Sequence, residues 1–323
     1  MSNLPFWTTE LKPGYPQVKT SWVEIGDGIK AYLAMPTEGT APFPAMILGH
    51  ERYGLVLDTL EQTAKFAAYG YVCIAPDMVA KFEGDKEALA KGHIMGGWDN
   101  DIVREYMTLS YDFVVKMPEV DTKKIAAIGL CASGHWPWLL NAERPDLAAC
   151  ICYYGGGPYN EELMDKVTAP TLYVYGEKDH TTPISRVFNF RDEMERHHKS
   201  CEIRLEPDMH HGWLNDTMAG RYRQKEAQEA WDRIIEFMER VFAGYYSNDR
   251  VKIRFEADFA RDYDFKKLVR WGELPYPEPD VASINTLKAK VASGELPPSE
   301  IDRMETLYSE FFNEHPHLKP SNA

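Results

Sequence analysis

Residues 125–134 read Ile-Ala-Ala-Ile-Gly-Leu-Cys-Ala-Ser-Gly, an apolar run that leads into a cysteine flanked two residues away by small side chains. The apolar run is typical of a buried strand, and the pattern small-x-nucleophile-x-small is typical of a sharp turn from a strand into a helix. Such a turn strains the backbone of its central residue, and the small residues Gly129 and Ser133 leave room for the close approach. The segment therefore predicts that Cys131 stands exposed at a strand end, beside a helix N-terminus that favours a thiolate.

Strand-like and helix-like patterns alternate around this segment. A hairpin is expected at residues 22–34, around Gly26-Asp27-Gly28. Further strands are expected at 45–49, 71–75, 124–129, 148–154, 171–175 and 201–205, with helices at 57–69, 102–116, after residue 131, at 183–197 and at 223–242. This alternation predicts an α/β fold with a mostly parallel central sheet flanked by helices, and a ligand site at the carboxyl ends of its strands.

The alternation stops near Gly244, so we expect an α/β domain at residues 1–244 and a largely helical or irregular extension at 245–323. Helices are expected at 282–292 and 299–314, and the second has an apolar stripe that must pack on another surface. The extension is expected to pack on the core or to form a homodimer contact. A lid over the pocket is the alternative.

The charge balance narrows the class of partner. The 323 residues include 50 acidic and 36 basic side chains, a formal net charge of −14. Nucleic acids and anionic membranes require clustered Lys and Arg, so neither is expected as a partner. No run of 18 apolar residues suggests a membrane span, and residues 1–16 do not resemble a signal peptide. We expect a cytoplasmic protein that acts on a small molecule.

The five cysteines do not suggest a disulfide framework, because their number is odd and no secretion signal is evident. Cys150 and Cys152 are separated by one residue and have no second cysteine pair, which disfavours a zinc site. Four of the five lie in strand-like apolar runs and are expected to be buried, Cys131 being the exception. No metal and no cofactor are expected.

Two further residues complete a catalytic pattern. Asp179 follows the strand at 171–175, and His211 follows the strand at 201–205. A nucleophile, an acid and a base that each follow their own strand are hard to obtain by accident. The order predicts a triad of Cys131, His211 and Asp179, in which the aspartate orients the histidine and the histidine ionises the thiol.

Three alternatives at the same residues are less favoured. His210 could replace its neighbour His211 as the base. Ser133 could be a nucleophile, but it lies beyond the apex of the turn. A zinc site could be built from Asp179, His180, His210 and His211, although adjacent histidines of an extended segment point apart.

With these residues in view, residues 23–242 resemble the dienelactone hydrolase family of α/β-hydrolases. The family's GxCxGG turn appears at 129–134, with Ser133 where a glycine is usual, and its acid loop and His-Gly-aromatic turn appear at Asp179 and at 211–213. Residues 49–54, Gly-His-Glu-Arg-Tyr-Gly, match the family's Gln-Glu-aliphatic-Phe-Gly segment. The resemblance implies an α/β-hydrolase fold and hydrolysis of lactones from aromatic ring-cleavage pathways. It covers about two thirds of the chain and implies nothing about the extension.

The resemblance also implies roles for three residues near the nucleophile. Glu51 would be the internal carboxylate that contacts the thiol and helps to control its protonation. The backbone N–H groups of Arg52 and Ala132 would form the oxyanion hole. Substrate-binding residues are less defined. The family carries an arginine shortly after the catalytic histidine, whereas the first arginine after His211 in this sequence is Arg221. The candidates are Arg52, Tyr53, Trp98, Arg104 and Trp213.

The choice of sulfur restricts the substrate. Thiolate is itself a good leaving group, so the tetrahedral intermediate returns to reactants unless the other oxygen leaves comparably well. Enol and phenol esters meet this condition and alkyl esters do not, so we expect enol-lactone hydrolysis with weak activity on alkyl esters. The alternatives are an esterase for other activated esters, or a non-catalytic ligand-binding or redox-sensing protein that uses Cys131.

Overall fold

The computed structural model describes residues 18–26, 28–156, 159–218, 220–247, 250–257, 288–294 and 297–298. The chain divides into two compact units, Met1–Asp262 and Tyr263–Ala323. In the second unit residues 288–292 are helical. The rest of the two helices expected at 282–292 and 299–314 lies outside the described residues, as does any dimer contact through them.

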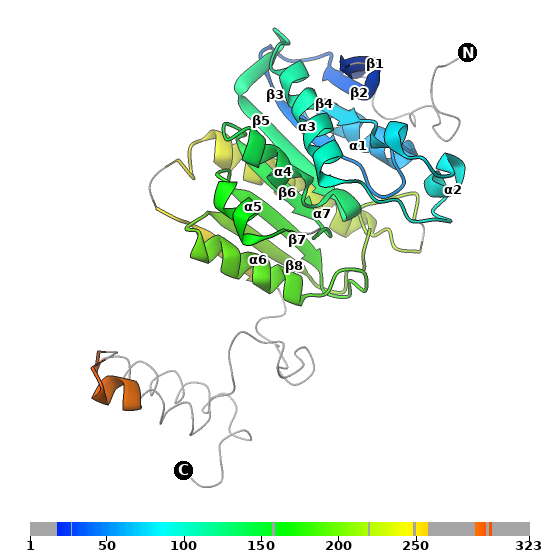
Figure 1. Ribbon diagram of the computed structural model, residues 1–323. Coiled ribbons are helices and arrows are strands. Elements are labelled where there is room, and N and C mark those ends of the chain that lie inside the picture. Colours follow the sequence, from blue (N-terminus) through cyan, green and yellow to red (C-terminus); the bar gives the residue numbers. More distant parts are fainter. Residues whose placement is uncertain are drawn as a thin grey trace. The chain divides into compact units, whose positions relative to one another are not determined.

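A nine-stranded sheet runs through the first unit in the order β1-β2-β4-β3-β5-β6-β7-β8-β9 (Figure 1). β1 pairs antiparallel with β2, and β2 pairs antiparallel with β4, whereas every later pair is parallel. The strands are β1 (Val18–Gly26), β2 (Ile29–Pro36), β3 (Phe43–Gly49), β4 (Val72–Pro76), β5 (Val120–Leu130), β6 (Ala149–Tyr153), β7 (Thr171–Gly176), β8 (Cys201–Glu206) and β9 (Ile253–Ala257). The hairpin and the mostly parallel sheet are confirmed.

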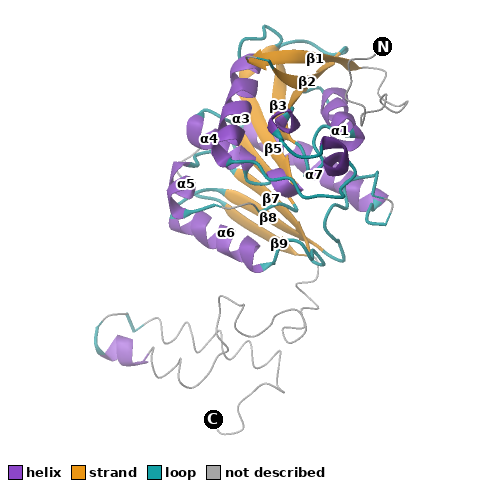
Figure 2. Ribbon diagram, turned by 45° about the vertical axis from the view of Figure 1, so that its right-hand side comes forward, coloured by secondary structure: helices purple, strands orange, loops and turns teal. Residues whose placement is uncertain are grey.

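Helices cover both faces of this sheet (Figure 2). One face packs against α3, α4, α5 and α6, and the other against α1 and α7, and each face has its own apolar core. The helices are α1 (Leu57–Ala68), α2 (Lys86–Ala90), α3 (Asn100–Val114), α4 (Trp136–Glu143), α5 (Glu161–Lys166), α6 (Ser185–Arg196) and α7 (Gln224–Phe242), with short 3₁₀ turns η1 (Met78–Lys81) and η2 (Cys131–Ser133).

The alternation continues one strand beyond the predicted end. β9 follows α7 and pairs with β8, so part of the segment assigned to the extension belongs to the sheet. The sequence of β9 hides this because Arg254 and Glu256 alternate with its apolar residues, and Glu256 forms an ion pair with Arg233 of α7 at 3.1 Å. An edge strand with one charged face is less apolar than the central strands.

Four of the five cysteines lie in strands of the sheet, which explains why their side chains are buried. Cys73, Cys150, Cys152 and Cys201 are buried and carry free thiols, as predicted, while Cys131 is partly exposed. Within the described residues, no helix combines the length and the apolar character that a bilayer crossing requires.

Candidate active site

β5 ends in a sharp turn that presents Cys131. Cys131 has a φ angle of +57°, which lies in the left-handed region that residues with a Cβ rarely adopt. The turn requires a glycine at position 129, because a Cβ on Gly129 would lie 2.0 Å from the carbonyl oxygen of Ser133. The predicted turn from strand to nucleophile is therefore present, and its strain holds the thiol at the carboxyl end of the sheet.

Ser133, which replaces the family's usual glycine, has a structural place. Its side chain is fully buried, and its Oγ accepts a hydrogen bond from the Leu130 N–H at 2.8 Å. The same hydroxyl lies 2.9 Å from the carbonyl oxygens of Gly49 and Leu130, to either of which it can donate. This hydroxyl links the ends of β3 and β5, and it does not face a substrate.

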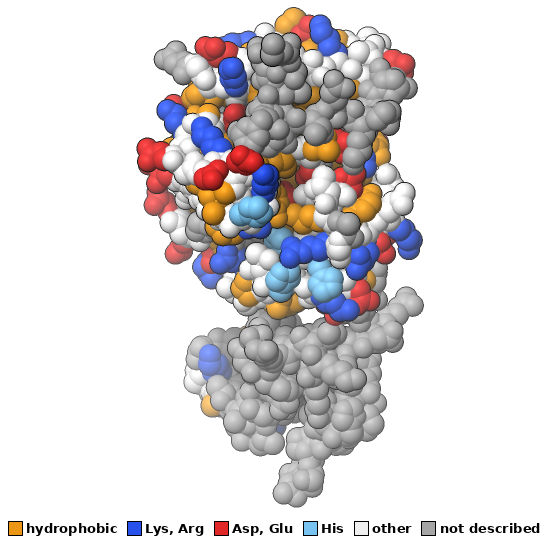
Figure 3. All heavy atoms as spheres, turned by 90° about the vertical axis from the view of Figure 1, so that its right-hand side faces the viewer, with side chains coloured by type: hydrophobic (Ala, Val, Ile, Leu, Met, Phe, Trp, Pro, Cys, Tyr) orange, Lys and Arg blue, Asp and Glu red, His pale blue; other side chains and the backbone are white. Residues whose placement is uncertain are grey.

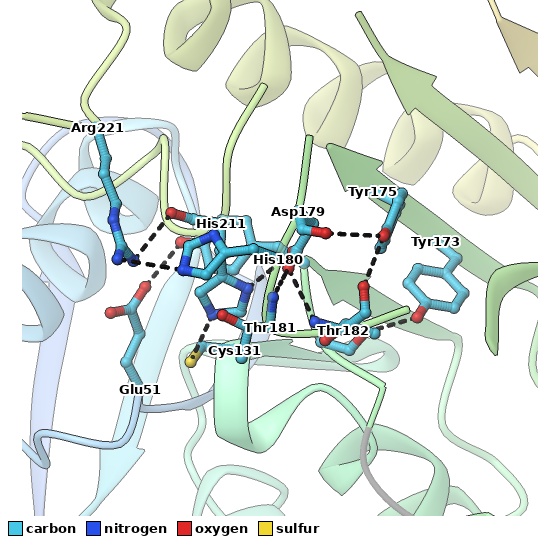
Figure 4. Close-up of polar contacts among 12 residues, drawn as sticks. Glu51, Cys131, Tyr173, Tyr175, Asp179, His180, Thr181, Thr182, His211 and Arg221 are labelled. Atoms are coloured by element: carbon cyan, nitrogen blue, oxygen red, sulfur yellow. Dashed lines mark hydrogen bonds and ion pairs between the residues drawn. The ribbon is translucent and has the colours of Figure 1, made fainter. Parts of the chain in front are cut away.

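The nucleophile, base and acid predicted from the sequence come together (Figure 4). His211 Nε2 lies 3.0 Å from Cys131 Sγ, and His211 Nδ1 lies 2.8 Å from Asp179 Oδ2. His211 comes from the loop after β8 and Asp179 from the loop after β7, so the ends of β5, β7 and β8 at one edge of the sheet supply the three groups. His210 is exposed, which removes it as the alternative base.

The loop of Asp179 fixes the carboxylate that orients the histidine. Asp179 Oδ1 accepts hydrogen bonds from the N–H groups of Thr181 at 2.8 Å and Thr182 at 2.9 Å. Its other oxygen, Oδ2, is left for His211. Because both oxygens have partners, the carboxylate cannot rotate away without losing hydrogen bonds to its charged form.

The electrostatics of this chain of contacts favour a protonated imidazole. Burial alone would lower the pKa of His211, but its hydrogen bonds to Asp179 and Cys131, and the negative charges of both partners, raise it to about 10. A histidine charged at neutral pH beside a thiol stabilises the thiolate, which is the form that attacks a carbonyl.

Glu51 lies behind the nucleophile rather than in contact with it. Its carboxylate accepts hydrogen bonds from the Tyr154 hydroxyl at 2.8 Å and from Asn215 Nδ2 at 3.1 Å. Among the described residues it has no hydrogen bond to Cys131, so the contact implied by the resemblance is not observed. Burial raises the pKa of Glu51, although both hydrogen bonds oppose that effect. Control of the thiol's protonation by Glu51 remains a prediction.

Sequence reasoning missed the two partners of Glu51. Tyr154 directly follows β6 and adopts a φ angle of +35°, and its ring packs edge-on against His211 at 5.2 Å between centroids. Tyr154 and Asn215 are 103 and 164 residues away from Glu51 along the chain. No local pattern marks such contacts, and only the position of Tyr154 after a strand could have indicated it.

The two amides expected to form the oxyanion hole are available. Arg52 and Ala132 line the cavity that contains Cys131 and His211. Among the described residues the Arg52 N–H has no backbone acceptor, and Ala132 is the second residue of η2, where an N–H has no acceptor within its own helix. A pair of unsatisfied amides beside a nucleophile is the arrangement that stabilises a tetrahedral oxyanion.

A cavity of about 700 Å³ opens above the thiol and is rich in cationic side chains. Arg52, Arg186, Arg221 and His180 line it, and Figure 3 shows histidine, Lys and Arg side chains gathered on one face of the molecule. Arg221 lies 3.5 Å from both the His211 carbonyl oxygen and His180 Nε2, to which it can donate (Figure 4). Arg221 was set aside as too distant along the chain, and Arg186, near the start of α6, was missed.

The remaining substrate-binding candidates divide in two. Tyr53 lines the cavity with Arg52, whose guanidinium lies 4.7 Å from the centroid of its ring. The other three candidates are not among the residues that line the cavity, and a role for them in substrate binding stays a prediction. Trp98 packs against the rings of His50 and Trp136. Trp213 packs against the rings of Tyr153 and Tyr154. Arg104 forms ion pairs with Asp101 and Glu143 on the surface of α3. The two tryptophans thus contribute to packing, and the arginine contributes to surface ion pairs.

Among the described residues, no group of three or more His, Cys, Asp or Glu side chains has the arrangement of a metal site. The zinc alternative required His210, which is exposed, together with His211, whose two ring nitrogens face Cys131 and Asp179. His211 therefore has no nitrogen left for a metal.

The geometry agrees with comparisons to known proteins. A sequence profile described as the dienelactone hydrolase family matches residues 29–242. The chain belongs to the dienelactone hydrolase family. A Yersinia pestis protein provisionally named carboxymethylenebutenolidase is 25% identical over 224 residues, covering 66% of this chain and 84% of that protein. An Escherichia coli K12 protein with the same provisional name is 26% identical over 231 residues, covering 68% of this chain and 84% of that protein.

Solved structures support the fold. The crystal structure of a Klebsiella pneumoniae protein, provisionally described as a dienelactone hydrolase, superposes with a TM-score of 0.61 at 22% identity, covering 69% of this chain and 98% of that one. A dienelactone hydrolase-like promiscuous phosphotriesterase from metagenomic libraries gives 0.60 at 19% identity, with coverages of 69% and 98%. Likeness at this level confirms the α/β-hydrolase fold, and family membership makes the chain a hydrolase.

Proposed function

We propose that this dienelactone hydrolase family member hydrolyses an activated carboxylic ester, an enol lactone that carries a carboxylate, through a thioester on Cys131. The observation that carries the proposal is the position of His211 between Cys131 Sγ at 3.0 Å and Asp179 Oδ2 at 2.8 Å. A binding protein would not need a thiol, an imidazole and a carboxylate in one continuous chain of contacts.

The reaction begins with attack of the Cys131 thiolate on the lactone carbonyl carbon. The carbonyl oxygen becomes an oxyanion and accepts hydrogen bonds from the N–H groups of Arg52 and Ala132. Collapse breaks the ring C–O bond, and the proton of His211 passes to the departing enolate oxygen. The neutral His211 then takes a proton from water, whose oxygen attacks the thioester. Collapse breaks the C–S bond and releases the thiolate and the product acid, which loses its remaining proton to solvent as the carboxylate.

The charge of the cavity supports an anionic substrate. The protein carries a net charge of −14, so an approaching anion is repelled unless cations shape the local field. Arg52, Arg186 and Arg221 line the cavity and supply such a field. The carboxylated lactones of aromatic ring cleavage have this charge and an enolate leaving group, and we propose them as the substrate class.

The test is a substrate panel that separates leaving-group quality from charge. Purified protein is assayed with a carboxylated enol lactone, an aryl ester and an ethyl ester of one acyl group, with and without a chelator. We expect turnover of the lactone and aryl ester, little of the ethyl ester, no effect of chelator, and inactivation by iodoacetamide. Equal turnover of the ethyl ester would contradict the cysteine mechanism.

Variants assign the activity to the site. Cys131→Ala should lose at least about 10³-fold in kcat, whereas Cys73→Ala, which removes a buried thiol of β4, should not. Rapid quenching and mass spectrometry should find the acyl group on Cys131 in the wild type. Unchanged hydrolysis by Cys131→Ala would contradict the assignment of Cys131 as the nucleophile. Ligand binding without turnover in the wild type would favour the binding or redox-sensing alternative.

A further inference from the structure

His50 occupies a fully buried site directly before the segment expected to stabilise the oxyanion. Its ring lies between two tryptophan rings, with centroids 5.1 Å from Trp98 and 5.2 Å from Trp136. These contacts leave the imidazole no room to swing. The ring is therefore held in one orientation.

The ring of His50 makes a short polar contact with the backbone of the next residue. His50 Nδ1 lies 2.6 Å from the carbonyl oxygen of Glu51. A carbonyl oxygen only accepts, so Nδ1 must carry the hydrogen and donate it. The same oxygen also accepts from the Gly54 N–H at 3.2 Å.

Fixing this carbonyl also fixes an amide. The Glu51 carbonyl and the Arg52 N–H belong to one planar peptide unit, in which C=O and N–H point in opposite directions. Two hydrogen bonds hold the carbonyl toward the interior, so the N–H of Arg52 points the other way. Arg52 lines the cavity with Cys131 and Ala132.

The hydrogen bond from His50 to the Glu51 carbonyl comes with a loss of stability elsewhere in the ring. With Nδ1 protonated, Nε2 is a bare acceptor, and it has no hydrogen-bond partner among the described residues. A buried acceptor without a partner destabilises the fold, because it has lost its hydrogen bonds to water. An apolar side chain in the same aromatic pocket would avoid that cost, but it could not donate to Glu51.

We infer that His50 is a positioning residue for the oxyanion hole: its Nδ1–H fixes the peptide between Glu51 and Arg52 so that the Arg52 N–H points at the substrate oxygen. The inference rests on the cysteine mechanism proposed above. It predicts that His50 affects only steps that form a tetrahedral oxyanion. Direct alkylation of Cys131 forms none and should not depend on His50.

The test compares His50→Leu with His50→Asn, because the asparagine amide nitrogen can occupy the position of Nδ1 and donate to the same carbonyl. For ester hydrolysis we expect His50→Leu to lose about 10²-fold in kcat and His50→Asn to recover at least about tenfold of it. Alkylation of Cys131 by iodoacetamide should stay within about twofold of the wild type in both variants. If His50→Leu does not fold, His50→Phe, which also fits an aromatic pocket, replaces it.

A second measurement works without turnover. A trifluoromethyl ketone adds to a thiolate and places an oxyanion in the hole, and its Kd is obtained from protection of Cys131 against iodoacetamide. We expect His50→Leu to weaken this Kd about 10²-fold and His50→Asn to restore it. An unchanged Kd in His50→Leu, an equal loss of alkylation, or no recovery in folded His50→Asn would overturn the inference. Absence of lactone hydrolysis in a wild type that binds the ketone would contradict the proposed function alone.

Discussion

The loop around His211 and the aromatic pocket around His50 each bury a histidine ring, but the pKa values of the two rings are shifted in opposite directions. His211 is buried between Asp179 and Cys131, whose hydrogen bonds and charges outweigh burial and raise its pKa to about 10. His50 is buried between tryptophan rings, and burial lowers its pKa to about 4 despite its contact with the Glu51 carbonyl. Burial is common to both, and the charge of the partner decides which protonation state survives.

The difference in pKa gives the two histidines different roles. A charged His211 can stabilise a thiolate and give up a proton during the reaction. A neutral His50 has one N–H at a fixed position and cannot change state near neutral pH, so it can hold a backbone group without responding to the reaction.

The largest effect is expected from removing the charge beside His211. Asp179→Asn takes away the carboxylate that raises the pKa of His211 and selects its tautomer, so hydrolysis should fall by about 10³–10⁴-fold. Alkylation of Cys131 near neutral pH should also slow, because less thiolate is present. Asp208→Asn is the matched control, since Asp208 is exposed and pairs with Lys178 outside the triad. Loss of activity in both variants would contradict the assignment of the acid.

The second effect concerns stability in acid. His50 and His135 are both buried with pKa values lowered to about 4. Between pH 6.5 and about 4 the unfolded chain binds these protons and the folded chain does not, so stability falls as pH falls, by about 3 kcal/mol for each histidine. Buried Glu51 and Asp58 have raised pKa values and oppose this trend.

Comparing the wild type with a variant of one histidine cancels the contributions of Glu51 and Asp58, because both proteins contain them. Urea unfolding of the wild type and of His135→Gln, which keeps a donor for Asn100 Oδ1, is followed from about pH 8 to about pH 4.5. The wild type should lose stability relative to the variant as the pH falls, while their difference above pH 7 stays constant. Parallel curves throughout would show that folding does not lower the pKa of His135.

A smaller effect is expected in the cationic cavity. Arg221→Gln should raise KM about tenfold for a carboxylated lactone and leave KM for a neutral aryl ester unchanged, because one charge partner of the anion is lost. Arg104→Gln removes an arginine that pairs with Asp101 on the surface of α3, and neither KM should change. An equal rise for neutral and anionic substrates would indicate that Arg221 only supports the loop of His211.

The smallest effect is expected behind the nucleophile. Tyr154→Phe removes a hydrogen bond that lowers the pKa of Glu51, so that pKa should rise further and the acid limb of the kcat/KM profile should move to higher pH. The loss at neutral pH should be about threefold to fivefold. Tyr153→Phe, whose hydroxyl donates to the Ala230 carbonyl at 2.8 Å, should leave the profile unchanged. A shift in neither variant would remove Glu51 from the control of the thiol.

The sequence was sufficient where a function depends on what directly follows a strand. Cys131, Asp179 and His211 each follow their own strand, and parallel strands bring such ends together. It was insufficient where a contact depends on packing. Trp98 looked like a pocket wall and instead packs on His50, and Arg186 reaches the cavity from a helix whose sequence carries no motif. β9 was missed because the charges on an edge strand conceal its apolar pattern.

The buried hydroxyl of Ser133 has a consequence for how substrates are selected. Through the Gly49 carbonyl and the Leu130 N–H it connects the ends of β3 and β5, and Arg52 and Ala132 follow those two ends along the chain. The spacing of the two amides is thereby set before any ligand arrives, and little conformational entropy is lost when an oxyanion binds. A site preorganised in this way discriminates by fit, so a lactone with a displaced carbonyl oxygen should be rejected in kcat more than in KM.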